Sequence, residues 1–192
     1  MSEQISTQIK PETQTQVDEN FKKIGIFPGT FNPIHNGQLI VAEQIINHYD
    51  LDAFFFCLLE NNEDDQERIQ MIQLSINGNS KFHIVNKIYP NNKKIVDDFI
   101  EKYPETEILF IAGASKLQVT KDFNFSNNQV KLIGLVESKI KKTKELKIEW
   151  FKFPRLDISS ELIRENIKHY KTVRYLIPDI VAAYIAEYNL YK

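Results

Sequence analysis

Short, largely apolar runs recur along the chain between longer segments with helical spacing, and this alternation limits the fold more than any other feature. The runs lie at residues 22–27, 53–59, 81–85, 107–113 and 129–136. They are nearly continuous rather than alternating, which is the pattern of a strand whose two faces are both buried. The runs therefore predict strands of a sheet that is covered on both sides.

The segments between the runs carry apolar residues three and four positions apart, as amphipathic helices do. They span residues 37–49, 65–76 and 92–103, and residues 159–170 and 178–188 have the same spacing near the end of the chain. Pro178 is expected at the first position of the last helix. Strands and helices in succession predict an α/β fold, a doubly wound, Rossmann-like parallel sheet of five to six strands with a C-terminal helical segment. Such sheets bind ligands at the carboxyl ends of their strands.

The length and composition favour one domain. The chain has 192 residues, of which 42% are hydrophobic, enough for one sizeable core. We expect a single domain over residues 21–192, preceded at 1–20 by a disordered polar tail without the features of a signal peptide. Cys57 is the only cysteine, which excludes an intrachain disulfide, and we expect it to be buried.

Charge and apolar run length exclude several classes of partner. The chain holds 24 Lys and Arg against 26 Asp and Glu, so no excess charge draws it to nucleic acid. No apolar run approaches the roughly 20 residues that span a bilayer. The histidines at positions 48, 83 and 169 lack the spacing of metal ligands, so no protein-held metal is expected. We therefore expect a cytoplasmic protein whose partners are neither nucleic acid nor membrane.

A loop rich in proline and glycine, FPGTFNPIHNGQ (27–38), joins the first predicted strand to the first predicted helix. We expect the strand to end at Phe27 and the helix to begin near Asn36 or Gly37, because a proline disfavours helical geometry in the residue before it. The free N–H groups of that helix end, with a donor from His35, would form an anion site. A plain strand-to-helix turn with a surface histidine is the alternative.

The same loop resembles a family signature. GIFPGTFNPIHNG (25–37) is similar to the nucleotidylyltransferase pattern G-x-F-[GP]-G-[ST]-F-[DN]-P-x-H-x-G-H. Residues 158–191 resemble the C-terminus of the bacterial nicotinate mononucleotide adenylyltransferases, which reads I-S-S-T-x-I-R, then R-Y-L-V-P and a Y-I helix. PETEILFIAGASKL (104–117) and QERIQMIQLSI (66–76) resemble two further segments of that family. The resemblance covers residues 22–191.

The resemblance implies an enzyme of NAD synthesis. In that family ATP, with Mg²⁺, binds beside a mononucleotide whose phosphate attacks the α-phosphorus of ATP and releases pyrophosphate. Contacts with the reacting phosphates would fall to His35, Arg164 and Gln38. The residues implied in nucleotide binding are Gly29, Thr30 and Phe31, through backbone groups, together with Gly37, Gly113, Ser159 and Ser160. Phe123 aligns with an aromatic residue that stacks on the pyridine ring, and ordinary packing in the core is its alternative.

Several positions depart from the family pattern. Gln38 stands where the family has its second histidine, and an amide never carries positive charge, so the loss could cost on the order of 10²–10³ in rate. Ser115 replaces an acidic residue and is followed by Lys116, and Glu161 replaces a threonine. The loop at 60–67 is short and acidic, and residues 89–99 replace a segment that helps to bind the pyridine nucleotide. Lysines 93, 94 and 116 are candidates to restore positive charge.

These departures leave three hypotheses. The first, which we expect, is adenylyl transfer to nicotinate or nicotinamide mononucleotide, by a protein that could be a homo-oligomer. The second is transfer to another acceptor such as phosphopantetheine, because FPGTFNP is also close to that family's loop. The third is a catalytically impaired nucleotide-binding relative with a regulatory or scaffold role, which Gln38, Ser115 and Glu161 favour.

Overall fold

The computed structural model describes residues 20–59, 65–113, 127–136, 148–154 and 156–192. Its elements, in chain order, are β1 (Lys23–Gly29), α1 (Asn36–Tyr49), β2 (Ala53–Leu59), α2 (Asp65–Ile76), β3 (Phe82–Tyr89), α3 (Asn92–Lys102), β4 (Glu107–Gly113), β5 (Val130–Val136), β6 (Ile148–Lys152), α5 (Ser160–Lys168) and α6 (Asp179–Glu187). The predicted tail lies almost wholly outside these ranges, so the division between tail and domain stays a prediction.

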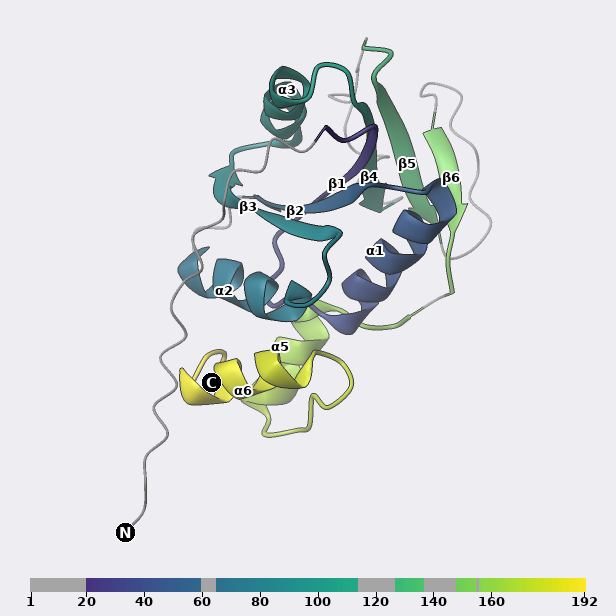
Figure 1. Ribbon diagram of the computed structural model, residues 1–192. Coiled ribbons are helices and arrows are strands. Elements are labelled where there is room, and N and C mark those ends of the chain that lie inside the picture. Colours follow the sequence, from purple (N-terminus) through teal and green to yellow (C-terminus); the bar gives the residue numbers. More distant parts are fainter. Residues whose placement is uncertain (1–19, 60–64, 114–126, 137–147, 155) are drawn as a thin grey trace.

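Within the described ranges, six strands form one parallel sheet in the order β3-β2-β1-β4-β5-β6 (Figure 1). The chain adds β2 and β3 on one side of β1 and then returns to add β4, β5 and β6 on the other side, so the strand order reverses between β1 and β4. This is the doubly wound α/β fold that the apolar runs predict. The sixth strand, β6, is one that the five apolar runs do not include, because it lies at the sheet edge and is buried only in part.

The two faces of the sheet bury separate apolar layers. Along β2, Phe54 and Phe56 point to the layer shared with α1, α2, α5 and α6, whereas Phe55 and Cys57 point to the layer shared with α3. Figure 1 shows α1 and α2 on one side of the sheet, α5 and α6 beside them, and α3 on the other side. Cys57 is fully buried, as expected, and burial raises the pKa of its thiol. No described helix is long and apolar enough to cross a membrane.

Two strand boundaries and one cap differ from the sequence prediction. β1 does not end at Phe27 but continues through Pro28, which pairs with Cys57 after the pairing with β4 has stopped at Ile26. The missing N–H of Pro28 therefore interrupts no bond between β1 and β4. β3 continues to Tyr89 instead of ending at residue 85.

Pro178 is the N-cap of α6 and not its first helical residue. Its backbone is non-helical, with φ −58° and ψ 142°, and its carbonyl oxygen accepts hydrogen bonds from the N–H groups of Val181 and Ala182, both at 3.0 Å. The sequence prediction placed Pro178 at the first helical position, one position beyond the N-cap where it lies. Both positions tolerate a residue without an N–H group, so the helix forms as predicted.

Candidate functional site

The sheet opens at the carboxyl ends of β1 and β4, where the strand order reverses. These two strands pair only from Lys23 to Ile26 and from Glu107 to Phe110. Pairing of β1 with β2 continues to Gly29, and pairing of β4 with β5 continues to Gly113. The last three residues of β1 and β4 thus separate from each other, and an ideal Cβ on Gly113 would meet no atom of the described residues within 4 Å. This is the place where doubly wound sheets bind ligands.

The loop after β1 is folded tightly around Phe31. Its backbone is left-handed, with φ 47°, and its ring is fully buried between Phe27 and Phe56. A Cβ on Gly29 would lie 2.8 Å from that ring, so glycine is required there by packing. The Phe31 side chain is therefore part of the core, and only its backbone, together with the exposed Thr30, could meet a ligand, as the sequence implies.

His35 is the N-cap of α1 and is only 9% exposed, so the alternative of a surface histidine is wrong. Burial lowers the pKa of its imidazole to about 4, which makes the ring neutral at pH 7. Its Nδ1 atom is buried without a hydrogen-bond partner among the described residues. A buried polar atom without a partner is rare, and it marks a site where a ligand could supply the missing bond.

Gly37 lies against this unpartnered atom, because a Cβ at Gly37 would come within 3.1 Å of Nδ1 of His35. Among the N–H groups of residues 35–39, only that of Gly37 makes no hydrogen bond within the described part of the chain. The Asn36 N–H donates to the Leu176 carbonyl oxygen, and those of residues 38 and 39 donate to the His35 carbonyl oxygen. The predicted anion site of free helix N–H groups is thus reduced to one backbone donor beside the imidazole.

Gln38 is engaged in capping α1. Its Oε1 atom accepts a hydrogen bond from the backbone N–H of His35 at 3.1 Å, which is one half of a capping box. The side chain is partly exposed, and its amide NH₂ remains a possible donor. The structure thus gives Gln38 a structural role at the site, and its catalytic role stays a prediction.

The C-terminal signature contacts the loop from the far end of the chain. The Ser160 hydroxyl donates to the Pro33 carbonyl oxygen at 2.8 Å, and Nη1 of Arg164 donates to the Asn32 carbonyl oxygen at 2.6 Å. Ser159 caps α5, since its Oγ accepts the Leu162 N–H at 3.1 Å. The two signatures, which lie near opposite ends of the chain, therefore meet at one loop.

Two contacts of this loop involve residues whose role sequence reasoning missed. Arg68, fully buried, donates from Nη1 to the carbonyl oxygens of Thr30 at 2.9 Å and Leu59 at 3.0 Å. The Tyr191 hydroxyl donates to Oδ1 of Asn32. The signal was present, because Arg68, Asn32 and Tyr191 all lie in the segments that carry the resemblance, but no local pattern shows that they meet.

The structure describes two of the three lysines proposed to restore positive charge. Lys93 and Lys94 form ion pairs with Asp97 and Asp98, one helical turn further along α3, at 2.6 and 2.8 Å. Their charges are therefore balanced on the surface of α3.

Glu161 is exposed in the first turn of α5. Phe123, Ser115, Lys116 and residues 60–64 of the acidic loop lie outside the described residues.

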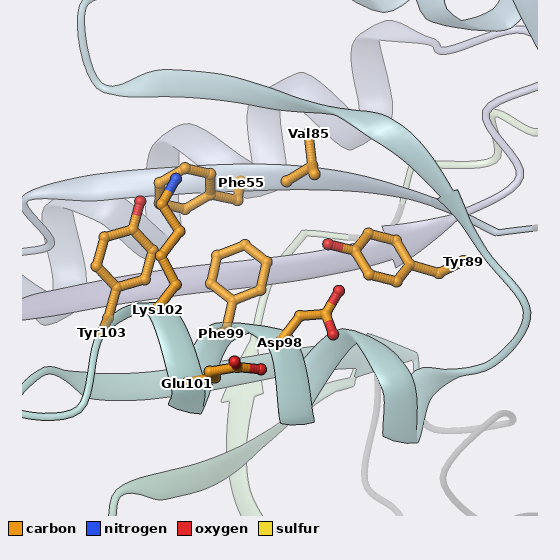
Figure 2. A pocket seen from close by; sticks show the side chains of 8 residues that line it. All are labelled: Phe55, Val85, Tyr89, Asp98, Phe99, Glu101, Lys102 and Tyr103. Atoms are coloured by element: carbon orange, nitrogen blue, oxygen red, sulfur yellow. The ribbon is translucent and has the colours of Figure 1, made fainter. Parts of the chain in front are cut away.

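A cavity of about 420 Å³ lies on the opposite face of the sheet, between β3 and α3 (Figure 2). Figure 2 shows the rings of Phe55, Phe99 and Tyr103 on one side of it and the Tyr89 ring with the Asp98 carboxylate on the other. The ammonium of Lys102 lies 5.1 Å from the centre of the Tyr103 ring. The cavity is on the α3 side and not on the α1 side, so it belongs to a different face from His35.

Among the described residues, no group of three or more His, Cys, Asp or Glu side chains could hold a metal ion.

Comparisons with known proteins agree on one group. The model of the cytidylyltransferase-like family matches residues 26–166. A probable nicotinate-nucleotide adenylyltransferase of Lactiplantibacillus plantarum is 31% identical over 98% of this chain and 96% of its own length. The nicotinate-nucleotide adenylyltransferase of Bacillus subtilis is 29% identical over 89% and 99%. The structure of the Plasmodium falciparum nicotinic acid mononucleotide adenylyltransferase complexed with NaAD superposes with a TM-score of 0.68 at 19% identity, covering 88% of this chain and 97% of that one, which supports the fold.

Proposed function

We propose that this chain, which belongs to the cytidylyltransferase-like family, transfers the adenylyl group of ATP to nicotinate mononucleotide. It matches nicotinate-nucleotide adenylyltransferases over nearly its whole length. The observation that carries the proposal is the meeting of both signatures at the loop between Gly29 and Gly37. Ser160 and Arg164 contact this loop where the sheet opens between β1 and β4. A dinucleotide product requires two nucleotide sites side by side, and a strand-order reversal provides them.

The reaction forms a bond between an oxygen of the acceptor phosphate and the α-phosphorus of ATP, and it breaks the bond from that phosphorus to pyrophosphate. His35 would donate a hydrogen bond to the α-phosphate as charge develops there. Its neutral ring holds one N–H, and phosphate bound beside it would raise the pKa of the imidazole and favour the charged form. Because the donor is fixed by burial before the substrate arrives, little reorganisation is needed during the reaction.

Arg164 would hold the outer phosphates of ATP. A guanidinium has five N–H donors in a planar fork, and within the described residues its one hydrogen bond is to the Asn32 carbonyl oxygen. The remaining donors suit phosphate oxygens. Helix α5 begins at Ser160 after its N-cap Ser159, and the positive end of its dipole would also attract the phosphates. The negative charge of the exposed Glu161 would weaken this attraction.

Mg²⁺ carried in on the triphosphate would neutralise part of its charge. The described residues supply no metal-binding cluster of their own, so we assign its ligands to the phosphates. We also propose that Phe123 stacks on the pyridine ring of the acceptor, as the family resemblance implies.

The test is pyrophosphate release by the purified protein with ATP and Mg²⁺, with nicotinate mononucleotide, nicotinamide mononucleotide or phosphopantetheine as acceptor. We expect release with nicotinate mononucleotide, and a fall of at least about 10² in His35→Ala, the scale of one lost preorganised donor. His48→Ala is the matched control, because His48 is exposed at the far end of α1. It should retain the activity.

A catalytically silent nucleotide-binding protein is the second candidate, because Oε1 of Gln38 is already used in capping α1. It predicts ATP binding in calorimetry with no release for any acceptor. Release with phosphopantetheine alone would instead change the acceptor and keep the chemistry.

A further inference from the structure

The end of the chain is folded back on itself by a specific helix stop. After α6, Asn189 adopts a left-handed backbone with φ 55°. The N–H of Leu190 donates to the Ile185 carbonyl oxygen at 3.0 Å, and that of Asn189 to the Ala186 carbonyl oxygen at 3.4 Å. These two bonds define a Schellman motif, which reverses the chain and satisfies the last carbonyls of the helix. The partly buried Leu190 packs against the core at this turn.

This reversal directs Tyr191 into the molecule. The residue itself is left-handed, with φ 65°, and its partly buried ring packs against the core layer on the α1 side. Its hydroxyl donates to Oδ1 of Asn32, 159 positions earlier in the sequence. Tyr188 provides a contrast, because it is 56% exposed and its ring packs on Tyr184 instead.

Asn32 is therefore held at two atoms. Tyr191 contacts its side chain, and Arg164 contacts its backbone carbonyl oxygen. Asn32 is only 9% exposed, so water has little access to replace these bonds. The next residue, Pro33, is held by Ser160. His35 follows this segment within three residues.

We propose that Tyr191 is a positioning residue for the transfer reaction, holding the Asn32 side chain so that the loop presents His35 to the α-phosphate. The proposal rests on the proposed function. In this role Tyr191 acts through its contact with Asn32 and not directly on the substrate. Removing its hydroxyl leaves the ring in the core but frees the Asn32 side chain, and a small displacement of a catalytic group is costly to the rate.

The experiment compares Tyr191→Phe with wild type, with Tyr188→Phe as the control that also loses one hydroxyl from the same end of the chain. We expect kcat to fall about ten-fold in Tyr191→Phe, the effect of one hydrogen bond, with the KM for the acceptor within about two-fold and the Tm within a few degrees. Tyr188→Phe should match wild type. Asn32→Ala should reproduce the loss, and the double variant should be no slower than either single one, because both remove the same contact.

A second measurement does not depend on turnover. The imidazole of His35 is followed by NMR as the pH is changed, with His35→Gln used to assign its signal. A loosened loop lets water reach the ring, so the pKa of His35 should rise from about 4 toward 6.5 in Tyr191→Phe and stay unchanged in Tyr188→Phe.

The outcomes separate the two claims. If wild type releases no pyrophosphate with any acceptor, the proposed function fails, and the His35 titration alone decides the role of Tyr191. If Tyr191→Phe keeps both the wild-type kcat and the wild-type pKa of His35, the positioning role is overturned. Independent, multiplying losses in Tyr191→Phe and Asn32→Ala would also overturn it.

Discussion

Replacing Arg68 by methionine should be strongly destabilising, because its guanidinium ties together the ends of two strands. The side chain is fully buried in α2 and donates to the carbonyl oxygens of Thr30, after β1, and Leu59, at the end of β2. It also forms an ion pair with Asp65, one turn earlier. Methionine fills much of the same apolar volume but donates no hydrogen bond, so the change isolates the polar contacts.

The magnitude follows from what each partner loses. A buried acceptor left without its donor costs about 1–3 kcal/mol, and both of these bonds are only partly buried, so the lower half of that range applies and two carbonyls give about 2–4 kcal/mol. The Asp65 side chain is 39% exposed, and water can replace the arginine there, so we add little for the ion pair. The expected loss is about 3 kcal/mol in the free energy of unfolding, equivalent to a fall of about 6–12 °C in Tm for a chain of this size.

Urea unfolding followed by circular dichroism measures this loss, with Arg174→Met as the matched control. Arg174 is exposed and lies over the Tyr175 ring, 5.3 Å from its centre, so its replacement should cost less than about 1 kcal/mol. Arg68→Lys should be intermediate, because an ammonium lacks the planar fork that reaches both carbonyls. A loss below about 1 kcal/mol in Arg68→Met, at an unchanged m-value, would refute the argument.

Three further changes test the loop itself. Because burial lowers the pKa of His35 from 6.5 to about 4, only the unfolded chain takes up a proton between these values, so the stability falls by up to about 3 kcal/mol as the pH drops through this interval. Urea titrations should show a shallower fall in His35→Asn, and equal slopes would contradict the assignment. Gly37→Ala places a Cβ 3.1 Å from Nδ1 of His35, so kcat should fall more than about ten-fold with little change in Tm, and a kcat within two-fold of wild type would argue against the close fit. Gln38→His should raise kcat about ten-fold or more, because histidine adds a donor that can carry positive charge. It should also lower the free energy of unfolding by about 0.5–1 kcal/mol, because the capping hydrogen bond to the His35 N–H is lost. An unchanged kcat would show that position 38 does not limit the rate.

The elements were predictable because the patterns that specify them are local. Continuous apolar runs located five of the strands, and the three-and-four spacing located the helices to within one or two residues at most of their ends. The proline and glycine loop located the start of α1 at Asn36. The edge strand β6 was the exception, because an edge strand needs no continuous apolar run.

The candidate site, like the fold, was predictable only where it depends on local sequence. The sequence alone determined that His35 and Gly37 stand at a helix start after a strand, since that depends only on neighbouring residues. Tertiary structure decided that His35 is buried and neutral, that Gln38 caps α1, and that Tyr191 reaches Asn32 across 159 positions. Contacts of this kind depend on how the strand order reverses between β1 and β4 and on where α5 and α6 pack, and periodicity within one element carries no information about either.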